Sequence, residues 1–291
     1  MIKTIGILWR FSRPHTIVGS FISVTALYSI ALRTNYEAFH WQTWLITLIS
    51  CLGCNLYITG LNQWADVEID SINKPKLPIV SGELSRQVAL RICLISLGIS
   101  LVLAVLSGWF FTVLIVLISL IGTAYSLPPL RFKKHHLGAA AAIGLVRGVM
   151  VNTVIYLHFH WSMTGAYEFP DSMVALTVFI TAFSIGIAWF KDIPDTAGDD
   201  RFQIRTLAVL LNRKRAFLLG AMLVIGAYGY MLWDAWQAGN MASLVAHGIF
   251  LSIFTGMCFI VDTGKQKSVR WFYMGFWLLF FAEYIVYPFL V

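Results

Sequence analysis

Charged residues are scarce in this chain. Asp, Glu, Lys and Arg together make up 12% of its 291 residues, whereas about a quarter of a soluble domain is charged. Hydrophobic residues account for 58%, and the mean hydropathy is +0.76. This excess of apolar side chains is too large for one soluble core, so the composition predicts an integral membrane protein in a lipid bilayer.

Cysteine is also scarce, with four residues, Cys51, Cys54, Cys93 and Cys258. The first two have the C-x-x-C spacing of redox and metal sites, but they lie inside an apolar run with no second pair nearby. We therefore expect all four to be packing residues. The N-terminal segment lacks a small-residue cleavage site and a Ser/Arg-rich extension, so we expect no cleaved leader.

Long apolar runs predict an all-α, polytopic membrane protein with about nine transmembrane helices in a single domain, residues 1–291. The third and fourth runs are separated only by S-G-W, and we divide them because together they are too long for one crossing. The expected spans are 15–32, 43–62, 87–106, 109–127, 137–158, 172–190, 215–233, 242–262 and 271–290.

The basic residues give a consistent topology. Of the 21 Lys and Arg residues, all but Arg33 and Arg147 lie in the N-terminal segment or in alternate connections, and therefore on one side. The positive-inside rule predicts that this side is cytoplasmic, with the C-terminus opposite. Loop charges of this kind explain the net charge of +7, and we expect no nucleic-acid partner.

Two long connections on the cytoplasmic side, 63–86 and 191–214, hold most of the 14 acidic residues. Each follows an apolar run and contains carboxylates spaced four residues apart. Glu68 is offset from this spacing, and we expect it to be solvated. The alternative for the whole set is that both connections are simply solvated acidic loops.

The spaced acids predict a metal site. Asn62, Asp66 and Asp70 share one face if the second span continues as a helix, and Asp195 and Asp199 repeat the spacing. Carboxylates at this spacing repel one another unless a cation neutralises them. An all-oxygen set suits Mg²⁺, which uses a few carboxylates and bridges to substrate phosphates.

Basic residues on the same side of the membrane predict that the substrate is a diphosphate. Metal ions would bridge to its oxygens, and cationic side chains would neutralise the remaining charge. Each base could alternatively serve only as a topology signal. The candidates are Lys74, Arg131, Lys133, Lys191 and Arg201.

Arg147 lies within a span, where a charged group is costly and normally faces a cavity or a partner. Together with Asn152 it is expected to form a polar wall of the active cavity, meeting a substrate carboxylate or diphosphate. The alternative is a structural ion pair with an intramembrane acid, for which Glu283 is the clearest candidate.

Two motifs carry a family resemblance. N-Q-W-A-D-V-E-I-D and K-D-I-P-D-T-A-G-D resemble the paired Asp-rich motifs of the UbiA superfamily of intramembrane prenyltransferases. The segments F-S-R-P-H-T-I-V-G, I-N-K-P-K-L-P-I-V-S-G-E-L-S, G-T-A-Y-S-L-P-P-L-R-F-K and V-R-G-V-M-V-N are similar to its homogentisate phytyltransferase branch. The resemblance extends over nearly the whole chain. In one departure, Asp200 occupies the place of an Arg that usually follows the second motif.

The resemblance implies nine helices around a central cavity and transfer of a phytyl or geranylgeranyl group from its diphosphate to an aromatic acceptor. It implies homogentisate, with decarboxylation, as the acceptor, in prenylquinone or tocopherol biosynthesis. The prenyl tail would lie in a channel open to lipid. Tyr125 is either a cavity residue or an interfacial tyrosine. The implied Mg²⁺ ligands are Asn62, Asp66, Asp70, Asp195 and Asp199, with Asp192 nearby. The catalytic candidates are Asp66, Asp70, Asp195, Asp199 and Arg147.

Three alternatives remain at this point. A prenyltransferase of this type could use another quinone precursor, a chlorophyllide or a carotenoid as acceptor. A transporter could use the acids as a cation site, although transporters place such sites near the membrane midplane. A membrane scaffold with solvated loops is the third. In a plastid, the active-site loops would face the stroma.

Overall fold

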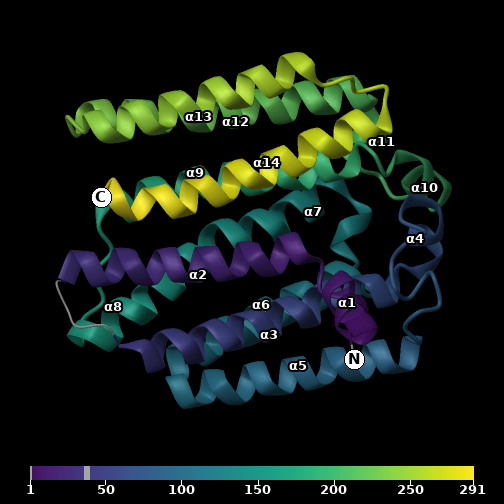
Figure 1. Ribbon diagram of the computed structural model, residues 1–291, viewed down its shortest axis with the longest axis horizontal. Helices are drawn as coiled ribbons and strands as arrows, with labels where there is room; N and C mark the ends of the chain where they lie inside the picture. The colour runs from purple at the N-terminus through teal and green to yellow at the C-terminus, as the bar shows by residue number, and fades with distance from the viewer. Residues whose placement is uncertain (1, 36–39) are drawn as a thin grey trace.

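The computed structural model describes the backbone of residues 2–35 and 40–291, and the side chains of these except at 2, 3, 34 and 35. The side chain of Lys3, used above for the topology, lies outside the described part. Helices make up nearly all of the regular structure of the described residues, which contain no strand (Figure 1). The helices are α1 (Ile2–Phe11), α2 (Pro14–Asn35), α3 (Trp41–Ala65), α4 (Val67–Asn73), α5 (Arg86–Ser107), α6 (Trp109–Ser126), η1 (Phe132–Lys134), α7 (His136–Ile143), η2 (Gly144–Ile155), α8 (Tyr156–Thr164), α9 (Asp171–Asp192), α10 (Thr196–Arg201), α11 (Leu207–Leu211), α12 (Arg213–Gln237), α13 (Met241–Ile260), α14 (Gln266–Val286) and η3 (Tyr287–Phe289).

Nine helical segments of the described chain are long and apolar enough to cross a bilayer, which confirms the expected number and order. Their ends agree with the expected spans to within a few residues, except at 137–158, which extends to Thr164. The division between the third and fourth spans is also confirmed. Gly108, with a φ of 113°, ends α5 and begins α6, and a residue with a side chain rarely adopts this conformation.

The fifth span differs from a regular α-helix. It begins as α7, continues as the π-helix η2 and ends as α8. A π-helix is rare and occurs frequently at functional sites. This stretch contains the intramembrane Arg147, and it packs closely against α9.

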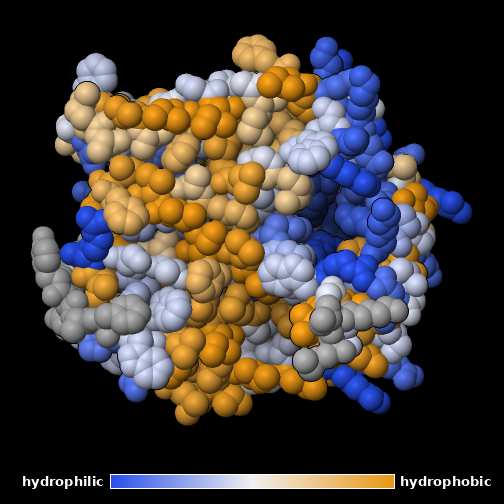
Figure 2. Space-filling model, viewed as in Figure 1, coloured by the Kyte–Doolittle hydropathy of each residue, from blue (hydrophilic) through white to orange (hydrophobic). Residues whose placement is uncertain are grey.

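The long helices lie side by side, and the short helices α4 and α10 meet at one end of the bundle (Figure 1). On the face shown in Figure 2, hydrophobic side chains cover a broad region across the middle, whereas hydrophilic side chains gather at the end with α4 and α10. Many large apolar residues of the spans are largely exposed in the structure, including Leu106, Trp109 and Phe259. Such a surface is stable only in contact with lipid, so the protein is an integral, multi-pass membrane protein.

Aromatic side chains fill the interior between α9, α12, α13 and α14. Phe183 stacks on Phe276 with a ring-centroid distance of 4.1 Å, and Phe190 meets the edge of the same ring at 5.0 Å. Both helices α9 and α14 also contact segments that carry site residues. The aromatic packing therefore fixes the frame in which the site is built.

The contact between η2 and α9 generates a stability prediction. A Cβ atom added at Gly148 would lie 2.5 Å from the Cα atom of Thr181, closer than backbone atoms can tolerate. We expect Gly148→Ala to lower the free energy of unfolding by about 1–3 kcal/mol, because the helices must separate. The measurement is the melting temperature of the detergent-solubilised protein.

Gly229→Ala is the matched control, because a Cβ atom at this helical position would meet nothing within 4 Å. It should leave the melting temperature unchanged or raise it slightly. Equal melting temperatures for the two variants would contradict the close approach of η2 and α9.

Candidate active site

The first acidic motif keeps its helical spacing across a helix boundary. Helix α3 ends at Ala65, and α4 begins after Asp66. The backbone N–H of Asp66 donates to the carbonyl of Asn62 at 3.1 Å, and that of Asp70 donates to Asp66 at 2.8 Å. The N–H of Lys74 continues this series to Asp70 at 2.7 Å. Asn62, Asp66, Asp70 and Lys74 therefore follow one another at helical intervals of four residues, as the sequence predicted for the first three.

The second motif has a similar build. Asp192 ends α9, Asp195 immediately precedes α10, and the N–H of Asp199 donates to the carbonyl of Asp195 at 3.1 Å. All three carboxylates are largely buried, with 5–7% of each residue exposed. Both connections thus direct buried carboxylates to the same end of the bundle.

Two neighbouring residues at the end of α4 join the motifs. The ammonium group of Lys74 lies 3.6 Å from Asp70 and forms a short ion pair with Asp195. The amide of Asn73 accepts a hydrogen bond from the N–H of Gly198 at 3.0 Å and donates to Asp199 at 3.3 Å. The structure therefore brings the two spaced-Asp motifs together.

Asp66 has a separate set of basic partners. Its carboxylate lies 2.5 Å from the ammonium group of Lys133 and 3.2 Å from the guanidinium of Arg131. The side-chain amide of Asn62 also donates to it at 3.1 Å. Two cationic side chains from the connection after α6 therefore neutralise the first motif.

We call the polar cavity between these motifs the acidic basin. Its lining includes Arg13, Asn62, Asp66, Asp70, Asn73, Lys74, Tyr125, Lys133, Lys191, Asp192, Asp195 and Asp199. Burial raises the pKa of Asp199 to about 8, and the carboxylates of Asp192 and Asp195 add to this. Burial also raises the pKa of Asp70, although Lys74 opposes the shift. The basin thus holds more carboxylates than its own cations stabilise in the charged form.

The donor set fits magnesium. All acidic groups offer hard oxygen ligands, and one oxygen of Asp70, Oδ2, is buried without a hydrogen-bond partner among the described residues. No three His, Cys, Asp or Glu side chains in the described part converge tightly enough to form a complete protein cage. Mg²⁺ bound with a phosphate substrate needs only one or two carboxylates, because phosphate oxygens and water complete its coordination.

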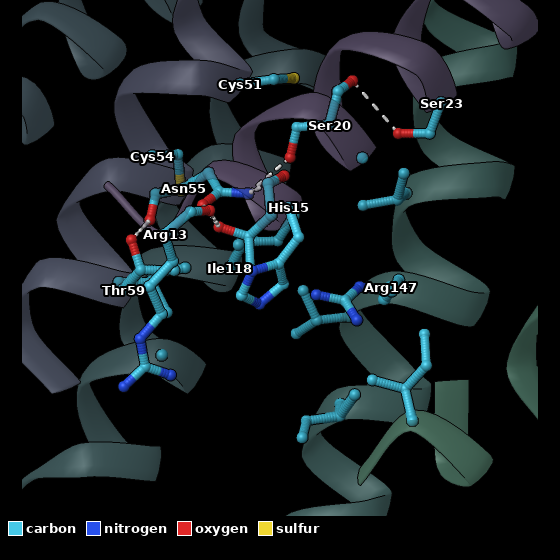
Figure 3. Close-up of a pocket in the computed structure, with 18 of the residues that line it drawn as sticks. Arg13, His15, Ser20, Ser23, Cys51, Cys54, Asn55, Thr59, Ile118 and Arg147 are labelled. Carbon is cyan, nitrogen blue, oxygen red and sulfur yellow. Dashed lines mark hydrogen bonds between the residues drawn. The ribbon is translucent and has the colours of Figure 1, made fainter. Parts of the chain in front are cut away.

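A second, mostly apolar cavity of about 240 Å³ extends from the basin into the bundle (Figure 3). Four residues line both spaces, namely Arg13, Asn62, Tyr125 and Lys191. Lys191 donates to the hydroxyl of Tyr125 at 2.7 Å, and Arg13 donates to the side-chain oxygen of Asn62 at 3.2 Å. These four residues define the junction at which a polar head group and an apolar tail would meet.

Arg147 lines the apolar cavity and has no ion-pair partner among the described residues. Its guanidinium lies over the ring of Trp277, 4.7 Å from the centroid, and 5.8 Å from that of Phe280. Glu283, the alternative partner expected above, instead lies 3.3 Å from His247. The proposed Arg147–Glu283 pair is therefore wrong. The guanidinium of Arg147 is instead available to an anion bound in the cavity.

Asn152 does not line the cavity, although we expected it to contribute to the polar wall. It is fully buried behind the wall, where its amide donates to the carbonyl of Gly148 at 2.6 Å and to that of Arg147 at 3.2 Å. The hydroxyl of Tyr284 donates to its oxygen at 2.7 Å. Asn152 therefore supports the backbone of η2 and joins it to α14.

The remaining candidates have different positions. Tyr125 lines both cavities, as expected for a cavity residue. Arg131 contacts Asp66 but lines neither cavity, and Arg201 is exposed at the end of α10 and lines neither. Glu68 is exposed, which confirms that it is solvated.

Sequence reasoning missed several residues of the site. Arg13 was counted only as a topology signal, yet it lies at the junction of the two cavities. His15 and Trp277 line the apolar cavity, and Asn73 joins the two motifs. The R-P-H-T segment and the N-K-P segment were noted only for their resemblance. The sequence signal that could have identified Arg13, His15 and Asn73 was a polar side chain close to the start or end of a predicted span.

The UbiA prenyltransferase family matches residues 22–281. The chain belongs to this family and is a prenyltransferase, which excludes the transporter and scaffold alternatives. It is 36% identical to homogentisate phytyltransferase of Synechocystis sp. (strain ATCC 27184 / PCC 6803 / Kazusa), over 98% of this chain and 95% of that protein. It is also 36% identical to the chloroplastic homogentisate solanesyltransferase of Arabidopsis thaliana, over 97% of this chain and 76% of that protein.

Solved structures share the fold. A UbiA homologue from Archaeoglobus fulgidus bound to DMAPP and Mg²⁺ superimposes with a TM-score of 0.67, covering 97% of each chain at 18% identity. A structure of digeranylgeranylglyceryl phosphate synthase gives a TM-score of 0.65 and covers 98% of this chain and 99% of that one, also at 18% identity. This likeness confirms the expected fold class.

The link through Asn73 generates a second prediction. Asn73→Ala removes the acceptor of the Gly198 N–H and leaves this buried donor unpaired, at a cost of about 1–3 kcal/mol. We expect faster amide hydrogen exchange in α10 than in the unmodified protein. Glu68→Ala, an exposed change on the same short helix, is the control. Unchanged exchange at Gly198 and Asp199 in the Asn73 variant would show that the motifs are held together in another way.

Proposed function

We propose that this prenyltransferase transfers a prenyl group of the phytyl or geranylgeranyl class from its diphosphate to homogentisate, with loss of the acceptor carboxylate as CO₂. The observation that carries the proposal is the direct junction of an acidic and basic basin with an apolar cavity that contains an unpaired arginine. Relatives that match almost the whole chain are homogentisate phytyl-, geranylgeranyl- and solanesyltransferases. The product would be an intermediate of prenylquinone or tocopherol formation.

The donor diphosphate is proposed to bind in the acidic basin with Mg²⁺. The proposed ligands are Asn62, Asp66, Asp70, Asp192, Asp195 and Asp199. When bound, Mg²⁺ would neutralise the charge that develops on the leaving diphosphate as the C–O bond breaks. The finding of Mg²⁺ and DMAPP in a protein of this fold is consistent with such a requirement.

The lysines of the basin would hold the diphosphate on the remaining sides. Lys74 and Lys133 pair with carboxylates that a metal ion would also contact, so binding of the metal would leave their ammonium groups for phosphate oxygens. Lys191, which lines both cavities, would lie beside the bond that breaks. Arg131 would act through its contact with Asp66, and the exposed Arg201 would attract the substrate from a greater distance.

The apolar cavity would hold the prenyl chain and shield its allylic cation from water. Ile118, Ile143 and Ile187 contribute apolar walls, and the rings of Tyr125, Tyr273 and Trp277 face the same space. Aromatic faces attract a cation, and the absence of competing water prevents its loss as an alcohol. Tyr125 lies at the junction, where the positive charge would arise.

Arg147 is proposed to bind the acceptor carboxylate. A planar guanidinium binds a carboxylate with two parallel hydrogen bonds, and the contact of Arg147 with the ring of Trp277 helps to hold it in place. A buried arginine without an acidic partner is otherwise costly in a membrane protein, so a substrate anion explains its presence.

The whole chain, residues 1–291, is proposed to form one catalytic domain. The basin lies at the end of the bundle that carries most basic side chains, and we propose that this end faces the cytoplasm, or the stroma in a plastid. The C-terminus would lie on the opposite side, as its position away from α4 and α10 in Figure 1 permits.

Product formation tests the proposed reaction. Membranes that contain the protein should convert homogentisate and phytyl or geranylgeranyl diphosphate to a prenylated, decarboxylated product, detected by mass spectrometry. EDTA should stop the reaction, and Mg²⁺ should restore it.

Asp66→Ala and Asp195→Ala should each reduce turnover at least about 100-fold, because several kcal/mol of transition-state stabilisation are lost. Glu68→Ala, the exposed control, should retain activity. Full turnover in either of the first two variants would contradict the proposed metal site.

The role of Arg147 has its own test. Arg147→Lys keeps the charge but loses the two-point contact with a carboxylate, so the KM for homogentisate should rise and turnover should fall well below that of the unmodified protein. The melting temperature without substrate should change little, because no acidic side chain loses a partner. Normal kinetics in the lysine variant, with a large loss of stability in Arg147→Ala, would assign the residue a structural role instead.

A further inference from the structure

The position of the His15 side chain follows from the way in which α2 begins. Pro14 occupies the first position of this helix, which suits a residue without a backbone N–H, and the preceding Arg13 has a φ of 53°. This turn places Arg13 and His15 on the wall of the apolar cavity, and Arg13 also lines the basin. Thr16, the next residue, is fixed by hydrogen bonds that its hydroxyl donates to the Arg13 carbonyl at 2.9 Å and to the Asn55 side chain at 3.1 Å.

The imidazole of His15 is held in place by ring contacts alone. Its ring centroid lies 5.0 Å from that of Trp277 and 6.4 Å from that of Tyr273, and both contacts are edge-on. Among the described residues, no side chain or backbone group forms a hydrogen bond with either ring nitrogen. Figure 3 shows the imidazole beside Arg147, in the space that both side chains line.

The ring nitrogens of His15 are therefore available to form a hydrogen bond with a bound molecule. Trp277 contacts both His15 and Arg147, so the same indole orients the two side chains. A phenolic acid held through its carboxylate by Arg147 would therefore present its ring and hydroxyl groups near the imidazole. A neutral imidazole has one nitrogen with an available lone pair, which can accept a phenolic proton.

We propose that His15 is a catalytic residue of the prenyl transfer, the general base that removes the phenolic proton of the acceptor as the new bond forms. This inference rests on the proposed function. The bond between the prenyl C1 atom and oxygen breaks, and its electron pair leaves with the diphosphate. A ring carbon beside the hydroxyl supplies the pair for the new C–C bond.

The phenolic proton passes to His15 in the same step, and the O–H electron pair forms a carbonyl. The departing diphosphate, which gains negative charge, then takes the proton from the imidazolium and returns His15 to its neutral form. The ring carbon finally loses its hydrogen as a proton while the carbonyl oxygen regains one, which restores the aromatic phenol. In the decarboxylation, the C–C bond to the carboxylate breaks, CO₂ leaves, and the side-chain carbon keeps the electron pair and takes up the proton that the diphosphate had accepted. General-base catalysis of this type contributes about 10²–10⁴-fold to a rate.

The test uses His15→Gln, which cannot accept a proton, and His15→Phe, which keeps the ring contacts with Trp277. Both variants should lower kcat with homogentisate at least about 100-fold. The KM for the prenyl diphosphate should stay within about threefold, and the melting temperature should change little. His40→Gln, an exposed change at the start of α3, is the control and should retain full activity.

A blocked acceptor separates proton removal from binding. Methylation of the hydroxyl beside the alkylated carbon removes the proton that His15 would accept, so the unmodified protein should slow to nearly the rate of His15→Gln. The same methyl ether should have little further effect on the variant. A methylation effect that is equally large in both proteins, a kcat of His15→Gln within threefold of the unmodified protein, or a loss of diphosphate binding or stability would each overturn the proposal.

The two proposals fail in different ways. If the unmodified protein forms no product from homogentisate with any prenyl diphosphate, the proposed function is wrong. If it forms product and His15→Gln does so equally fast, only the role of His15 is wrong. If it prenylates another phenol instead, the same comparison on that phenol tests His15 while the proposed acceptor is rejected.

Discussion

Repulsion between buried carboxylates is the constraint on which the rest of the site depends. Five aspartates lie at one end of the bundle, and Lys74, Lys133, Lys191 and Arg131 offset part of their charge. Without these ion pairs, like charges at such spacing would force α4 and α10 apart. Some repulsion between the buried carboxylates therefore remains, and a divalent cation bound together with a polyanion would reduce it.

Much of the fold could be predicted from the sequence because a bilayer imposes a simple rule of length. Nine apolar runs correspond to nine spanning segments in the described part of the chain, and even the division at Gly108 was visible as S-G-W. The short helices α4, α10 and α11 were harder to predict from the sequence, because a helix of one or two turns is too short to show an apolar period and depends on tertiary contacts. The π-helix was not predicted either, since an extra residue in a helical turn leaves the hydrophobic pattern almost unchanged.

The residues of the site likewise include some that could be predicted from the sequence and some that could not. Asp66, Asp70, Asp195 and Asp199 were recognisable because acidic residues at helical spacing next to a membrane require an explanation. His15 and Asn152 depended on side-chain direction, which a sequence does not specify. His15 turns into the cavity because Pro14 and Thr16 fix the start of α2, whereas Asn152 turns away from it toward Tyr284. Arg147 could be identified because a charged side chain is costly within a membrane span. Its contact with Trp277 could not be predicted, because Trp277 is apolar and lies 130 positions further along the chain.

The wide turn of η2 sets the relative orientation of the two halves of the fifth span. Its π-helical winding places the side chain of Asn152 under the carbonyl of Arg147, five residues earlier, which an ordinary α-helix would not do. Loss of a single residue from 144–155 would change the winding of this segment and with it the direction in which the side chains of α8 point relative to those of α7. Arg147 and Gly148 would keep their orientation relative to each other, but the side chains that follow them in η2 and α8 would lie on a different side of the span. The length of this segment is therefore fixed by geometry, and homologous chains that keep this wall should tolerate substitutions there far more readily than insertions or deletions.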